Sequence, residues 1–131
     1  MDTVTIEQEV ELPGTPKEVY EAYIDSVKHA AFTCFSAEID RKEGGEMRAG
    51  GDYISGKFLE LVPETRIVQT WHAADFPEGH HSRLELDLEP IENGTLLHMT
   101  HSGVPAEMKR DISEGWQRHY WDPLRAYLGQ H

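Results

Sequence analysis

The sequence has 131 residues, a length typical of one domain that folds without disulfide or metal crosslinks, so we expect a single domain over residues 1–131. Acidic residues outnumber basic ones by 24 to 12, and the resulting net charge of −12 argues against nucleic acid as a partner, because such a field repels phosphate. No apolar run approaches the roughly 20 residues of a membrane span, which predicts a soluble domain without membrane insertion.

The start of the chain and its cysteine content bear on location. Residues 1–6 alternate polar and apolar side chains and lack the basic start and continuous apolar stretch of a signal peptide. Cys34 is the single cysteine, so it cannot form an internal disulfide, which fits a reducing compartment. We therefore expect a cytoplasmic protein.

The first elements follow from periodicity and capping. Apolar residues at even positions over 4–12 predict a half-buried strand. Thr15 as N-cap, Pro16 at the first helical position and Glu18 three residues after the cap predict a helix that runs to about Ile24.

A second short helix is predicted directly after the first. Asp25 is a good N-cap, and the pattern extends to Phe32. We expect this helix to bury the small and β-branched residues Val27, Ala30 and Ala31.

From residue 37 onwards the turn signals predict an antiparallel meander of six more strands. The clearest strand, 81–89, places Ser82 and three leucines on one face and charged residues, including Glu85, Asp87 and Glu89, on the face towards solvent. Asn93 and Gly94 suit a type I′ hairpin, after which Leu97, Met99 and His101 share one face of the returning strand.

The last part of the chain is predicted to be a long helix. Pro123 lies inside its pattern and should kink it, because proline cannot donate to the carbonyl of His119. The expected buried face consists of Ile112, Trp116, His119, Tyr120, Pro123 and Tyr127.

Together these elements predict an α+β fold: a curved, seven-stranded antiparallel sheet around a long C-terminal helix, with two short helices after the first strand. A bent sheet that wraps around one helix tends to leave space between them, and apolar ligands bind in such spaces. Gly56, in mid-strand, should permit a bend or a close backbone approach, and Gly115 should permit close contact between helix and sheet.

A series of short motifs follows from the middle of the chain to its last helix. The motifs are Ser55-Gly56-Lys57-Phe58, Leu61-Val62-Pro63-Glu64, Ile67-Val68, Trp71, Phe76-Pro77-Glu78-Gly79-His80, Gly103-Val104-Pro105 and Gly115-Trp116-Gln117-Arg118-His119-Tyr120. In this order and spacing they resemble the C-terminal domain of one family, the activators of the heat-shock-protein-90 ATPase, and the resemblance covers about Pro13 to Leu128. It implies a START-related helix-grip fold like that of birch-pollen allergens.

The resemblance leaves three functions open. The first is a non-enzymatic domain that binds an apolar or lipid-like small molecule; the second is a co-chaperone surface for a heat-shock-protein-90-type chaperone, without a ligand. In the full activators a separate N-terminal domain carries most of the stimulation, so family membership and activity are kept apart. The third is a cyclase or hydrolase acting on an aromatic, polyketide-like substrate, as in some members of the superfamily.

For a ligand site we expect six residues to face one interior space, as each lies on the apolar side of its element or in a family motif. His101 would be the polar contact for a neutral ligand, or else a core histidine bonded to a neighbour. Anionic ligands are disfavoured unless Lys57 or Arg118 turns inward. The six residues are Phe58, Trp71, Met99, His101, Trp116 and Tyr120.

No metal, cofactor or catalytic residue is predicted. His98 and His101 are three apart on a strand, so they point to opposite faces and cannot bind one ion. The sequence has no Gly-x-Ser-x-Gly elbow, and the glycine pairs sit in hairpins rather than before a helix, where a phosphate would bind.

Overall fold

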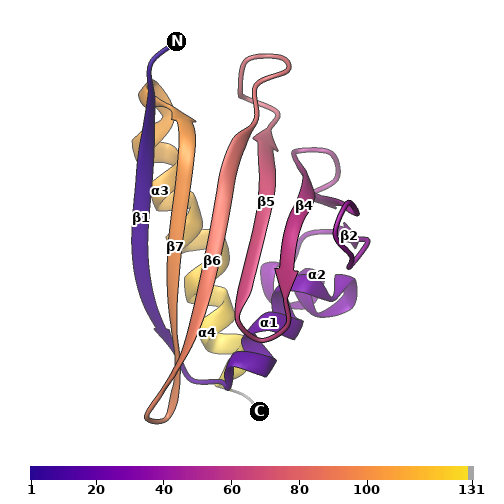
Figure 1. Cartoon of the computed structure of the whole chain (residues 1–131), viewed down its shortest axis with the longest axis vertical. Helices are drawn as coiled ribbons and strands as arrows, with labels where there is room; N and C mark the ends of the chain where they lie inside the picture. The colour runs from indigo at the N-terminus through magenta and orange to yellow at the C-terminus, as the bar shows by residue number, and fades with distance from the viewer. Residues whose placement is uncertain (130–131) are drawn as a thin grey trace.

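The computed structural model describes residues 1–129, and its elements follow the predicted order (Figure 1). The strands are β1 (Thr3–Leu12), β2 (Ala37–Ile39), β3 (Glu46–Ala49), β4 (Ile54–Val62), β5 (Arg66–Ala73), β6 (Ser82–Ile91) and β7 (Gly94–Pro105). The helices are α1 (Pro16–Ile24), α2 (Ser26–Thr33), α3 (Lys109–Trp116) and α4 (Asp122–Leu128), with a 3₁₀ turn (Ala106–Met108) before α3 and a π-helical turn (Gln117–Trp121) between α3 and α4.

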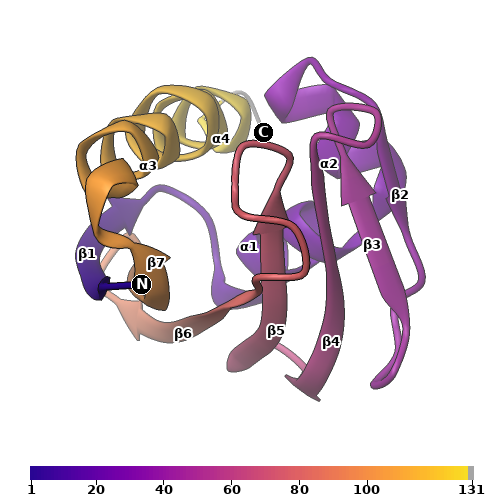
Figure 2. The ribbon, with the colours of Figure 1, turned by 90° about the horizontal axis from the view of Figure 1, so that it is seen from above.

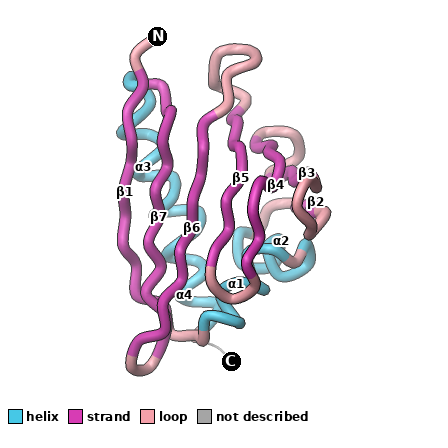
Figure 3. Tube along the Cα trace, in the orientation of Figure 1, coloured by secondary structure: helices cyan, strands magenta, loops and turns pink. Residues whose placement is uncertain are grey.

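The strands form one seven-stranded sheet in the order β1-β7-β6-β5-β4-β3-β2, and each neighbouring pair is antiparallel. Figure 3 shows the strands on one side of the molecule and the C-terminal helix behind them. Seen from above, the sheet curves around that helix, and α2 lies beside β2 and β3 at the far end of the sheet (Figure 2). The predicted α+β helix-grip architecture is confirmed.

The predicted faces of β6 are also confirmed, with one addition on the outside. Ser82 and the three leucines at 84, 86 and 88 are buried. The outward carboxylates of Glu85 and Asp87, expected only to face water, each accept a 2.6 Å hydrogen bond from Arg66, whose Nε donates to Glu60 at 2.8 Å. Arg66 thereby lowers the pKa of Glu85, although ion pairs at a surface add little stability each.

The capping box of α1 forms as predicted, but the buried face of α2 was predicted wrongly. The Thr15 hydroxyl accepts from the Glu18 N–H at 3.1 Å, and the Glu18 carboxylate accepts from the Thr15 N–H at 2.9 Å. Val27 is 78% exposed and Ala31 is exposed. The buried stripe of α2 consists of His29, Phe32 and Thr33, because these residues face the C-terminal helix.

The hairpin between β6 and β7 differs in detail from the prediction. Its two-residue loop is Glu92-Asn93, since Ile91 pairs with Gly94, and of the loop residues only Asn93 has a positive φ, 67°. It is therefore not a type I′ turn, which needs positive φ at both positions. Gly94 serves another purpose, because a Cβ there would lie 2.1 Å from the carbonyl oxygen of Leu12.

The C-terminal helical segment is interrupted just before Pro123. The Asp122 N–H bonds to the Gln117 carbonyl, five residues back, so the turn holds one residue more than an α-helical turn. This adapts the helix to the missing N–H of Pro123 and shifts the buried face by one residue. Ile112, Trp116 and Tyr120 are buried as predicted, but His119 is exposed, Pro123 and Tyr127 are only half-buried, and the face continues with Trp121, Leu124 and Leu128.

Two further predictions concern the backbone contact at Gly56 and membrane-spanning helices. Gly56 does permit a close backbone approach, because a Cβ there would lie 2.1 Å from the carbonyl oxygen of Thr70. Among the described residues no helix has the length and apolar character needed to cross a bilayer.

Candidate functional site

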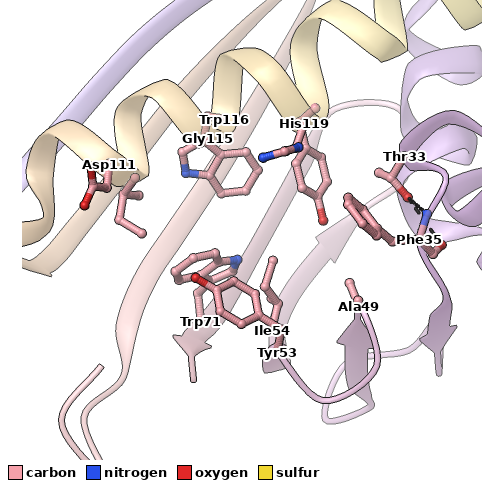
Figure 4. Close-up of a pocket in the computed structure, with 13 residues that line it drawn as sticks. Thr33, Phe35, Ala49, Tyr53, Ile54, Trp71, Asp111, Gly115, Trp116 and His119 are labelled. Atoms are coloured by element: carbon pink, nitrogen blue, oxygen red, sulfur yellow. Dashed lines mark hydrogen bonds between the residues drawn. The ribbon is translucent and has the colours of Figure 1, made fainter. Parts of the chain in front are cut away.

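A cavity of about 380 Å³ lies between the curved sheet and the first half of the C-terminal helix (Figure 4). Four parts of the chain build it: the end of α2, the segment from β3 to the start of β4, β5, and α3 with the π-helical turn. The lining residues are Thr33, Phe35, Ala49, Gly50, Tyr53, Ile54, Trp71, Asp111, Ile112, Gly115, Trp116, His119 and Tyr120.

Small residues on the walls leave this space open. Gly115 lines the cavity, and a Cβ added there would meet no atom within 4 Å. The prediction of close helix-to-sheet contact at Gly115 is therefore wrong, because the helix is separated from the sheet at this turn. Ala49 on β3 adds another short side chain to the lining.

The structure divides the six predicted site residues into two groups. All six are buried, with exposed fractions between 0% and 6%. Trp71, Trp116 and Tyr120 line the cavity. Phe58, Met99 and His101 do not; they belong to the buried interior of the sheet, as Met99 is fully buried between its partners Leu86 and Gln8 on the neighbouring strands.

His101 is held by two hydrogen bonds that use both ring nitrogens. The Trp116 indole N–H donates to His101 Nδ1 at 3.0 Å, so the proton of the neutral ring is on Nε2, which donates to the Ser82 hydroxyl at 2.7 Å. Ser82 in turn donates to the Trp71 carbonyl at 3.0 Å. Burial lowers the pKa of His101 to about 3, so the ring is neutral at physiological pH and has no free nitrogen for a ligand.

A second buried network, which sequence reasoning missed, lies behind Tyr120. Tyr120 donates its hydroxyl to His29 Nε2 at 2.9 Å, and His29 Nδ1 donates to the Tyr23 carbonyl at 2.7 Å. The Tyr23 hydroxyl donates to Gln69 Oε1 at 2.6 Å. The signal that could have found it is the spacing of His29, Phe32 and Thr33 on one helical face.

The Tyr120–His29 pair is tuned for the neutral state of both groups. Desolvation raises the pKa of Tyr120 and lowers the pKa of His29. Neither group is therefore poised to exchange a proton near neutral pH, and the pair fixes the orientation of the Tyr120 ring at the cavity wall.

The charge of the lining is small and negative. Asp111 is its only carboxylate, and no lysine or arginine contributes to it. Lys57 and Arg118, the two candidates for an inward cation, are both exposed and lie outside the lining. The mouth carries two partly exposed aromatic residues, Phe35 (50%) and Tyr53 (44%).

The histidines do not form a metal site in the described part of the chain. His98 lies on the outer face, where Glu9 accepts from its Nδ1 at 3.1 Å, whereas His101 is inside, so the predicted opposite orientation is confirmed. No group of three or more His, Cys, Asp or Glu side chains among residues 1–129 is arranged to hold a metal ion.

Trp71 carries the one unusual polar atom of the site. Its indole nitrogen is buried and has no hydrogen-bond partner, the only such side-chain nitrogen or oxygen among the described residues. A buried donor without an acceptor is unfavourable, so this nitrogen requires an explanation.

Comparison with known proteins places the chain in a family. The family described as "Activator of Hsp90 ATPase homolog 1-like protein" matches residues 13–129. The chain belongs to this family. The resemblance predicted from the motifs is thus confirmed over nearly the whole sequence.

A curated relative of this chain is considerably longer than the chain itself. The human activator of 90 kDa heat shock protein ATPase homolog 1 is 31% identical over 115 residues, which make up 88% of this chain and 34% of the human protein. This chain thus spans about a third of the length of that curated relative.

Solved structures show the same fold. An HSP90 activator from Plasmodium falciparum superposes with a TM-score of 0.88 at 25% identity, covering 95% of this chain and 96% of that one. The Aha1 dimer from Colwellia psychrerythraea has a TM-score of 0.81 at 19% identity, covering 95% and 96%, and supports the fold alone.

Proposed function

We propose that this member of the Hsp90-activator family binds a neutral, largely apolar small molecule in the cavity between α3 and the sheet. The cavity carries the proposal. Its volume of about 380 Å³ is of the size that small-molecule sites have, and its walls are mostly aromatic and aliphatic.

The charge of the lining supports a neutral ligand. Asp111 would repel an anion, and no lysine or arginine of the lining could pair with one. Burying an unpaired anion costs several kcal/mol, so phosphorylated or carboxylated ligands are disfavoured. His101, expected to orient the ligand, is already bonded to Trp116 and Ser82, so orientation must come from other groups.

The test is a fluorescence titration with Nile red, a neutral dye that brightens in apolar surroundings. Gly115→Leu should abolish the brightening, because the new side chain grows into the open space of the cavity. It should also raise the free energy of unfolding by about 0.5–1 kcal/mol, because leucine favours a helix more than glycine does.

The matched control is Glu114→Leu, which adds a leucine at the neighbouring exposed position of the same helix. This variant should bind Nile red as the wild type does. Ligand binding in this cavity would be contradicted if both variants lost the brightening of Nile red, or if the dye did not brighten with the wild-type protein.

A second function, contact with a heat-shock-protein-90-type chaperone, is favoured by family membership and by the 31% identity to the human activator. We expect these 131 residues alone to stimulate the chaperone's ATPase less than tenfold, since they match only 34% of the human protein. A coupled ATPase assay with the chaperone of the same organism tests this. Stimulation of about tenfold, equivalent to about 1.4 kcal/mol, would put the chaperone function first.

A further inference from the structure

The three indole N–H groups of this protein differ in their hydrogen bonding. Trp116 donates to His101 at 3.0 Å, and Trp121 donates to Gln8 at 2.7 Å. Trp71, which is 4% exposed, donates to nothing, although it is buried as deeply as Trp116 (3%). Two acceptors close to Trp71 are already occupied. His101 Nδ1 accepts from Trp116, and the Ser82 hydroxyl accepts from His101 Nε2.

The ring that carries the unsatisfied nitrogen belongs to the cavity wall, while the nitrogen atom itself is covered. Trp71 lines the cavity together with Ile54, which pairs with Ala73 and therefore stands on the same face of the sheet, one diagonal step from Trp71. Figure 4 shows the nitrogen at the ring edge turned towards Ile54, on the side of the other lining residues. Because the nitrogen atom is covered, contact with an acceptor atom in the cavity requires a shift of the half-buried Ile54 side chain.

We infer that Trp71 Nε1 donates a hydrogen bond to a carbonyl-type oxygen of the ligand, so that the cavity takes neutral, largely apolar carbonyl compounds, for which a small aryl ketone is a suitable probe. The inference rests on the proposed function of the cavity. The ligand supplies the acceptor that this N–H lacks, and the indole supplies a directional contact in a site whose walls are mostly aromatic and aliphatic.

The walls also define the shape of the ligand. The rings of Trp71 and Trp116 are 5.8 Å apart and tilted by 38°, too close to admit a third ring between them. The ligand therefore packs against their edges and against Tyr120. The Tyr120 hydroxyl donates to His29, so towards the ligand it offers only an acceptor, and Trp71 is the donor of this group.

The experiment uses 1-indanone and indane, two probes of equal ring size that differ in the presence of a carbonyl oxygen. Each is titrated into ¹⁵N-labelled protein, and the three indole N–H resonances are followed by NMR. With 1-indanone, the Trp71 resonance should move downfield, while those of Trp116 and Trp121 move little because they are already hydrogen-bonded. With indane, the Trp71 resonance should show no downfield movement.

Matched variants test the same contact by affinity. Trp71→Phe should weaken binding of 1-indanone about fivefold, the worth of one hydrogen bond, and leave binding of indane within about twofold. Trp116→Phe alters the same cavity but removes an N–H that is committed to His101, so it should change the affinity for both probes by the same factor. If Trp71→Phe fails to fold, the wild-type resonances still decide.

The outcomes separate this inference from the proposed function. Binding of both probes without downfield movement of the Trp71 resonance, or equal weakening of both by Trp71→Phe, would overturn the inference and leave the cavity as a ligand site. The inference would also be overturned if the Trp71 N–H resonance of the free protein lay upfield of the other two indole resonances and neither probe shifted it. Such a position would mean that the N–H faces an aromatic ring. Failure of both probes and of Nile red to bind would overturn the proposed function, and the inference with it.

Discussion

The space between sheet and C-terminal helix has two ends that are built differently. At the closed end, two separate side-chain pairs are hydrogen-bonded, His101 with Ser82 and Trp121 with Gln8, and each of these buried donors finds an acceptor. At the open end, Phe35, Tyr53 and Ile54 surround a cavity, and an indole N–H has no partner. Trp116 stands at the boundary and takes part in both. The closed end is thus packed and hydrogen-bonded, whereas the open end is left partly unfilled, so substitutions at the two ends should differ in their effect on stability.

The largest expected effect is at the closed end. Trp121 is fully buried, so Trp121→Ala should lower the free energy of unfolding by about 3–5 kcal/mol through the cavity it leaves. Phe35→Ala, which truncates a half-exposed ring at the open end, should cost less than about 1 kcal/mol. Urea unfolding measures both, and similar losses in the two variants would contradict the comparison.

A smaller effect concerns the pH dependence of the closed end. Since the pKa of His101 is about 3 in the folded protein, only the unfolded chain takes up the proton as pH falls below about 6.5, so stability is lost as pH falls. By pH 5 this one histidine should cost about 2 kcal/mol, and His29, whose pKa burial also lowers, acts in the same direction.

The variant His101→Gln isolates this effect, because glutamine can accept from Trp116 and donate to Ser82 without titrating. The difference in unfolding free energy between pH 7 and pH 5 should shrink by about 2 kcal/mol. As a control, His98→Gln should slightly steepen the loss. Glu9 raises the pKa of His98, so the folded protein holds that proton more tightly and gains stability as pH falls. An unchanged profile in His101→Gln would show that His101 is not buried as a neutral ring.

The smallest effect is expected at the mouth of the open end. The Tyr53 hydroxyl donates to Asp75 at 2.8 Å, but both groups are exposed to water. Tyr53→Phe should therefore change the free energy of unfolding by less than about 0.5 kcal/mol, measured by urea titration beside the wild type. A loss above about 1 kcal/mol would mean that the mouth is part of the stabilising network after all.

Most of the fold could be predicted from the sequence because its signals are local. Alternation in β6 and the capping box at Thr15 each need only a few neighbouring residues. The face of α2 and the second half of the C-terminal face were missed for a different reason. They depend on packing partners distant in sequence, and on a π-helical turn that a regular helical repeat does not anticipate.

The site was less accessible to sequence reasoning. Trp71, Trp116 and Tyr120 could be assigned to the interior, but periodicity gives a face and not a depth, so Phe58 and Met99 could not be separated from the cavity wall. Whether His101 is free depends on Ser82 and Trp116, which meet it only after three elements pack together.

The π-helical turn at Gln117–Trp121 makes the C-terminal helix a two-phase element. Its one extra residue sets the phase between α3, which lines the cavity, and α4, which packs into the core. Deleting a residue there would rotate everything after it by about 100°, turning Leu124 and Leu128 out of the core while α3 stayed in place. A substitution in the stretch that lines the cavity, such as at Gly115, leaves this phase unchanged, whereas a change in the number of residues at the turn exposes the stretch that anchors the end of the chain.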